Sequence, residues 1–176
     1  MKILVENVRD AIVSQFNISW SLLEYHFNDL DVEECLWKPC SKGVYVEKKP
    51  EGWFADWPKS EGYEVGPPNI AWLTWHIIFW WSMVFDYSFG NGNLKREDIP
   101  WPGTITDVRK TIFQFRRDWL DKLNSLPDEE FVNTDRTKWP FENKPFYELA
   151  AWLNLELMKN ATEIGYCRFL YANRSK

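Results

Sequence analysis

Polar side chains on one face of the last long helical segment are the residues best placed to do chemistry. At about 100° per residue, Glu156, Asn160 and Glu163 share a helix face whose two ends are apolar. A carboxylate on a buried face is costly unless it is paired, hydrogen-bonded or bound to a metal ion. Two hypotheses follow: these side chains hold or assist a metal ion, or they form ion pairs and hydrogen bonds between helices.

A histidine in an aromatic segment is the second feature. His76 lies within WLTWHIIFWW (residues 72–81). Neutral imidazole is the commonest metal ligand in proteins and the usual acid–base group near neutral pH, although a single histidine on an apolar face is more often a packed core residue. His26 is the only other histidine, and it falls on the apolar stripe of an earlier segment. We expect His26 to serve packing.

Four segments carry helical patterns that would position these residues. Apolar residues recur at three- and four-residue steps over about 5–30, and Asn69 suits the N-cap of a second helix to Phe89. A third helix is predicted from Thr106, as its cap, to Leu126, and a fourth over about 145–173. The pattern predicts one all-α domain over residues 1–176, an up-down four-helix bundle in which sites are built from inward-facing side chains.

The stretch between the first two helices, residues 31–69, is rich in proline and glycine and is predicted to be irregular. Within it, residues 44–47 and 53–56 could pair as a short hairpin. A loop this long is often functional, for example as a lid. The second helix is apolar almost all round, so both of its faces should be covered, one by the bundle and the other by a second subunit.

Composition narrows the class of protein. The chain has 176 residues, 12 of them Trp, and a net charge of −5 without a basic run, which argues against a nucleic-acid binder. The most apolar stretch, residues 70–85, is shorter than the roughly 20 residues that a membrane-spanning helix needs. Three cysteines and a start without an apolar signal core favour a soluble cytoplasmic protein. Phosphate-loop, dinucleotide-binding, nucleophile-elbow and H-E-x-x-H motifs are absent.

Two segments carry a family resemblance. Residues 70–77 (IAWLTWHI) and 154–165 (NLELMKNATEIG), in this order after LWKP at residues 36–39, resemble the DinB/YfiT-like family of four-helix-bundle proteins, and the resemblance covers most of the chain. It implies a frequently homodimeric bundle that holds a divalent metal with three histidines. One histidine comes from the second helix and two come from an H-x-x-x-H pair on the fourth.

This chain departs from that pattern. His76 stands at the first position, but Glu156 and Asn160 stand where the histidine pair would be, followed by Glu163. A neutral amide is a poor ligand for zinc or nickel, and the set suits a harder ion such as Mn²⁺ better. The resemblance therefore implies a degenerate site at His76, Glu156 and Asn160, for one divalent ion (Ni, Zn or Mn) or for none.

Two functional hypotheses stay open at this point. In the first, the protein is a metal-assisted enzyme, a thiol transferase or a hydrolase, in which Glu163 either supports the metal ligands or acts as the base. In the second, it is a non-catalytic or stress-related bundle protein with a relic metal centre, whose pocket, lined by Trp72, Trp80 and Trp152, holds a small apolar or aromatic ligand. The two missing histidines favour the second hypothesis, and the retained His76, Glu156 and Glu163 favour the first.

Overall fold

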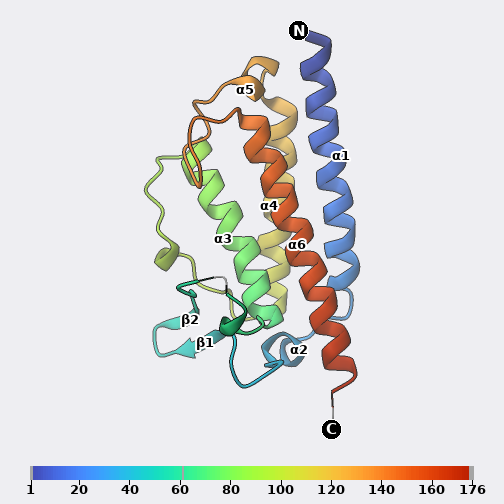
Figure 1. Ribbon diagram of the computed structural model, residues 1–176, viewed down its shortest axis with the longest axis vertical. Helices are drawn as coiled ribbons and strands as arrows, with labels where there is room; N and C mark the ends of the chain where they lie inside the picture. The colour runs from blue at the N-terminus through green and yellow to red at the C-terminus, as the bar shows by residue number, and fades with distance from the viewer. Residues whose placement is uncertain (1, 61, 175–176) are drawn as a thin grey trace.

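Long helices dominate the computed structural model, which describes residues 2–60 and 62–174. Within these residues, the four long helices that lie side by side are α1 (Lys2–Phe27), α3 (Ile70–Phe89), α4 (Ile105–Ser125) and α6 (Phe146–Ala172) (Figure 1). α1 and α3 each pack against both α4 and α6, so the four helices enclose one core. The predicted all-α class is confirmed.

The direction of the helices differs from a strictly alternating up-down order. In Figure 1, α1 and α6 run one way while α3 and α4 run the other. The cause is the connection over residues 90–104, which returns along the bundle before α4 begins. The backbone N–H of Trp101 donates to the carbonyl of Trp53 (3.3 Å), and the Trp75 indole donates to the carbonyl of Ile99 (2.7 Å). These bonds hold the end of the connection beside the start of α3.

Capping residues define where the helices begin. The Asn69 side chain accepts a hydrogen bond from the N–H of Trp72 (2.9 Å), as predicted for the start of α3. The predicted cap of α4 was wrong by two residues: Thr104 is the cap and accepts from the N–H of Asp107 (3.1 Å), while Thr106 lies inside the first turn. The sequence analysis did not predict the short elements α2 (Val32–Leu36), η1 (Tyr63–Val65), η2 (Arg96–Asp98) and α5 (Asp128–Val132).

The hairpin predicted in the irregular region is present. β1 (Val46–Lys49) pairs antiparallel with β2 (Gly52–Ala55), with Val46 opposite Ala55 and Lys49 opposite Gly52. The strands therefore start later and earlier, respectively, than residues 44–47 and 53–56. The tight turn ends at Gly52, whose φ of 142° favours glycine.

Indole N–H groups attach the surrounding loops to α3. Trp72 donates to the carbonyl of Asp56 (2.7 Å), and Trp101 donates to the hydroxyl of Thr74 (2.9 Å). Together with the bond from Trp75, these contacts cover the outer face of the first turns of α3 with segments of the same chain. The apolar surface that suggested a second subunit is thus partly buried within the chain, and a homodimer stays a prediction.

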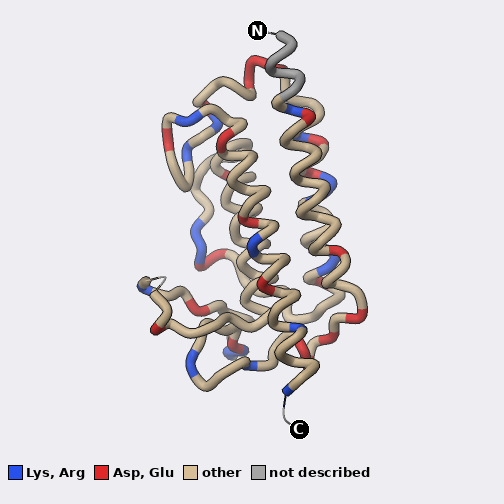
Figure 2. Tube along the Cα trace, turned by 45° about the vertical axis from the view of Figure 1, so that its right-hand side comes forward, with Lys and Arg blue, Asp and Glu red and all other residues tan. Residues whose placement is uncertain are grey.

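Basic and acidic positions are interspersed along the described part of the trace (Figure 2). None of the described helices is long and apolar enough to cross a membrane.

Candidate functional site around His76

Aromatic rings enclose His76 in the first half of α3. Its side chain is buried, with 7% exposure. The imidazole stacks on Trp72, with ring centroids 4.6 Å apart and planes 20° apart, and Trp80 meets it edge-on at 5.4 Å. A ring in this position has lost most of its water, which disfavours the charged imidazolium.

Hydrogen bonds determine which nitrogen of His76 carries the proton. The indole of Trp80 donates to Nε2 (2.9 Å), and an indole is only a donor, so Nε2 is unprotonated. Nδ1 lies 3.0 Å from Oδ1 of Asn160, whose Nδ2 donates to the backbone carbonyl of Glu156 (2.7 Å). A carbonyl only accepts, which fixes the amide orientation and makes Nδ1 the donor. His76 is therefore a neutral imidazole with both nitrogens bonded.

The electrostatics agree with this assignment. Burial lowers the pKa of His76 from 6.5 to about 4; the hydrogen bond to Asn160 opposes this change, and the charge of Lys159 adds to it. At neutral pH the ring is uncharged.

The two glutamates of the predicted site lie in different environments on α6. Glu156 pairs with Lys159 one turn away, with Nζ 2.7 Å from Oε2. Glu163 is half-buried, and among the described residues no ion pair or hydrogen bond reaches its carboxyl group. Burial raises the pKa of Glu163; Lys159 opposes this rise and Glu156 adds to it. The carboxylate of Glu156 is therefore paired with a lysine of the same helix, whereas the carboxyl group of Glu163 has no such partner among the described residues.

A cavity of about 760 Å³ opens beside His76. Trp72 and His76 line it from α3, and Lys159 and Glu163 line it from α6. The rest of the lining comes from the irregular region between Val44 and Pro68, and Trp57 is the bulkiest side chain in that part. The loop that was predicted to be functional therefore lines a cavity that Trp72, His76 and Glu163 of the predicted site also line.

The three predicted pocket tryptophans are not together. Trp72 lines the cavity, whereas Trp80 lies beyond His76 and packs edge-on against Trp152, with centroids 4.8 Å apart. Trp80 instead supplies the hydrogen bond to His76. The donor role of Trp80 was not predicted from the sequence, although residues spaced i, i+4 on a helix, as His76 and Trp80 are, have neighbouring side chains.

The predicted ligand atoms do not fit a divalent metal in this arrangement. Zinc or nickel needs an imidazole nitrogen with a free lone pair, yet the only unprotonated nitrogen of His76 accepts from Trp80. The amide of Asn160 is bonded at both atoms, and Glu156 is paired with Lys159. Among the described residues, no group of three or more His, Cys, Asp or Glu side chains is arranged to hold a metal ion.

The sequence was compared with models of known protein families. The sequence profile of the DinB superfamily matches residues 15–164, which include every residue of the predicted site. The chain belongs to the DinB superfamily. No curated protein and no solved structure matches it. In this DinB superfamily protein, the matched region contains the helices α3 and α6, which carry His76, Asn160 and Glu163.

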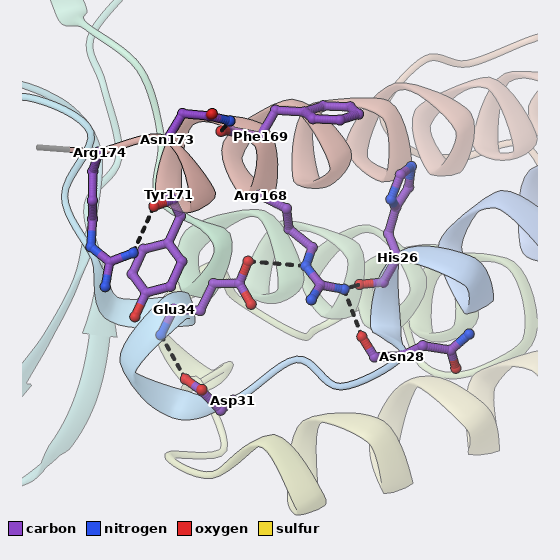
Figure 3. Close-up of polar contacts among 9 residues, drawn as sticks. All are labelled: His26, Asn28, Asp31, Glu34, Arg168, Phe169, Tyr171, Asn173 and Arg174. Carbon is purple, nitrogen blue, oxygen red and sulfur yellow. Dashed lines mark hydrogen bonds and ion pairs between the residues drawn. The ribbon is translucent and has the colours of Figure 1, made fainter.

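A second polar cluster in this DinB superfamily protein surrounds Arg168 of α6 (Figure 3). Its guanidinium donates to the carboxylate of Glu34 (3.0 Å) and to the backbone carbonyls of His26 (2.9 Å) and Asn28 (2.6 Å). These bonds attach the end of α1 and the start of α2 to α6. His26 takes part through its backbone, and its ring is not part of the site around His76.

Proposed function

We propose that this DinB superfamily protein binds a small organic molecule in the cavity beside His76. We also propose that the residues at the position of the family's metal centre form an internal hydrogen-bond network. The observation that carries the proposal is that both ring nitrogens of His76 are bonded to uncharged partners, Asn160 and Trp80.

The cavity supports a binding function. Its volume of about 760 Å³ lies within the roughly 300–1,000 Å³ typical of small-molecule sites. Trp57 and Trp72 provide apolar surface, while Glu163 and Lys159 provide a few polar groups that can orient a ligand. The network behind His76 fixes the imidazole, and the imidazole stacks on Trp72. The wall is therefore formed before a ligand arrives, which lowers the ordering cost of binding.

A metal-assisted thiol transferase or hydrolase is the second candidate. The raised pKa of Glu163 favours it, because a carboxyl group poised nearer neutral pH suits general base catalysis. This hypothesis requires Trp80 to release Nε2 of His76 to the ion.

Metal content and stability distinguish the two candidates. We expect wild-type protein, purified without a tag or chelator, to contain far less than one divalent ion per chain and to show no thermal stabilisation by Mn²⁺, Ni²⁺ or Zn²⁺. The variant Trp80→Phe removes the hydrogen-bond donor to Nε2 of His76, so that this nitrogen becomes free to bind a metal ion. About one ion per chain in the wild type, lost in His76→Ala, would overturn the proposal.

Ligand binding is measured with a neutral, apolar fluorescent probe, N-phenyl-1-naphthylamine. We expect saturable binding that weakens by on the order of tenfold in Trp72→Ala, which removes a ring from the cavity wall. Trp139→Ala is the control, since Trp139 packs against Trp80 away from the cavity. Equal binding by both variants and the wild type would contradict the assignment of the site.

A further inference from the structure

The charges at the cavity wall are unequal. Among the described residues, three charged side chains line it: Lys59, Lys159 and Glu163. Lys159 already has a partner, since its Nζ lies 2.7 Å from Glu156. Lys59 is an exposed loop residue, and the charges that shift the pKa of Glu163 are those of Lys159 and Glu156. The half-buried carboxyl group of Glu163 is thus the charge inside the cavity that lacks a partner.

Aromatic rings stand near this carboxyl group. The face of an aromatic ring carries negative partial charge and attracts cations, most strongly for tryptophan. Trp57 already binds a cation in this way, because the Arg96 guanidinium lies 5.0 Å from its ring centroid. Trp72 lines the same cavity as Glu163. A cavity lined by both a carboxylate and indole rings is the combination that recognises a positively charged organic group.

We infer that the cavity selects organic cations, with an ammonium group placed beside Glu163 and an apolar or aromatic body placed against Trp57 and Trp72. This inference rests on the proposed binding function and adds the class of ligand. A bound cation would supply the partner that Glu163 lacks, removing the cost of a half-buried unpaired carboxylate.

An anionic ligand is the opposite case. It would be attracted only to Lys159 and Lys59, would compete with Glu156 for the first of these, and would be repelled by Glu163. The order of affinity for cationic, neutral and anionic ligands of equal size therefore reports which charge controls the cavity.

Three matched probes test the inference: 2-phenylethylammonium, 2-phenylethanol and phenylacetate. Isothermal titration calorimetry at pH 7 and low salt gives their affinities for the full chain. We expect the ammonium to bind on the order of tenfold more tightly than the alcohol, because an ion pair with the Glu163 carboxylate replaces the hydrogen bond of an uncharged hydroxyl to the same carboxylate. We expect phenylacetate to bind most weakly. Glu163→Gln should reduce the affinity for the ammonium to about that for the alcohol, and should change the affinity for the alcohol much less.

Glu148→Gln is the matched control. Glu148 lies on the same helix but pairs with Lys144 at the surface, with 40% of its side chain exposed. We expect this variant to keep the full preference for the ammonium. Thermal unfolding of both variants verifies that they fold.

The outcomes separate the inference from the proposed function. If ammonium and alcohol bind equally and Trp72→Ala weakens both, the cavity binds ligands but does not select cations, and the inference is overturned alone. A preference for phenylacetate, or an ammonium preference that survives Glu163→Gln, also overturns it. If none of the three probes binds and the neutral phenylnaphthylamine probe also fails, both the inference and the proposed function are overturned.

Discussion

The two histidines of the chain lie against the same helix, α6, in opposite chemical environments. His76 is bonded through both ring nitrogens to uncharged groups and stacks on Trp72. His26 is only partly buried; its ring packs over Gly165 and contacts Tyr25, with ring centroids 5.1 Å apart. The charge near His26 is carried by Arg168, which binds the backbone of His26 rather than its ring.

Helix geometry explains how one helix supports both environments. Asn160, which contacts His76, and Gly165, which contacts His26, are five residues apart, so they point about 140° away from each other. The side facing His76 places uncharged polar groups in the interior. On the side facing His26, the partly exposed Arg168 pairs with the buried carboxylate of Glu34. The difference teaches that the polar groups bonded to the His76 ring are uncharged, whereas the charged groups beside His26 pair with each other. Glu163, at the cavity, is a charged group without such a partner among the described residues.

The largest expected effect comes from breaking the charged cluster with Arg168→Ala. The Glu34 carboxylate, whose side chain is 8% exposed, would lose its cation, and the carbonyls of His26 and Asn28 would lose a donor. Removing one partner of a buried ion pair typically costs about 3–5 kcal/mol. Because Arg168 itself is 26% exposed and water can enter, we expect a loss of about 3–4 kcal/mol in the free energy of unfolding. Urea unfolding measures it.

Lys144→Ala is the control for this prediction. Lys144 and its partner Glu148 are both exposed, so its loss should cost less than about 1 kcal/mol. Adding Glu34→Gln to Arg168→Ala should recover part of the stability, because a neutral amide is less costly to leave unpaired. Equal losses for the Arg168 and Lys144 variants would show that the cluster has no special role.

A smaller effect is expected from acid at His76. The pKa of His76 is lowered by burial to about 4, against 6.5 in the unfolded chain, so the unfolded state takes up the proton first as the pH falls. The free energy of unfolding should therefore decrease between about pH 6.5 and pH 4, by about 2–3 kcal/mol in total. Glu163 acts with the opposite sign, because its raised pKa lets the folded state regain stability on protonation.

The variant His76→Gln isolates the histidine from these other groups. The difference between its pH–stability curve and that of the wild type cancels the contribution of Glu163. His26→Gln is the comparison, since burial and the charge of Arg168 also lower the pKa of His26, but this ring is more exposed. If the His26 variant removes more of the pH dependence than the His76 variant, the assignment of His76 as a neutral buried ring is wrong.

Periodicity and capping were enough to predict the long helices from the sequence. These two patterns did not locate the start of α4, because Thr104 and Thr106 are both suitable capping residues. The backbone is extended at Thr104 and already helical at Thr106, so Thr104 is the cap. The short helices α2 and α5 span about one turn, which is too short to show a period. The predicted up-down order of the helices was not met because the connection over residues 90–104 returns along the bundle, and the length of a connection does not show its path.

The candidate site was predicted less completely. Helix faces and the family resemblance identified His76, Asn160 and Glu163. The bonds that decide what His76 can do depend on the direction of side chains in the folded protein, so the donor role of Trp80 did not follow from residue type. The ion pair of Arg168 with Glu34 joins residues far apart in the chain, and no local pattern points to it.

The smallest effect tests the contact of His26 with α6. A Cβ at Gly165 would lie 2.4 Å from Cε1 and Nε2 of the His26 ring, so Gly165→Ala must displace that ring. Against this cost, alanine is favoured over glycine within a helix by about 1 kcal/mol. Because the ring is partly exposed and can rotate outward, we expect Gly165→Ala to lower the free energy of unfolding by only about 1 kcal/mol.

In the His26→Ala background the obstacle is gone, and the same substitution should become stabilising by about 1 kcal/mol. Urea unfolding of the four proteins measures this coupling, and equal effects in both backgrounds would mean that the ring is not the obstacle. The NMR signal of the His76 ring should stay unchanged in all variants that retain it, because the two histidines lie on different sides of α6.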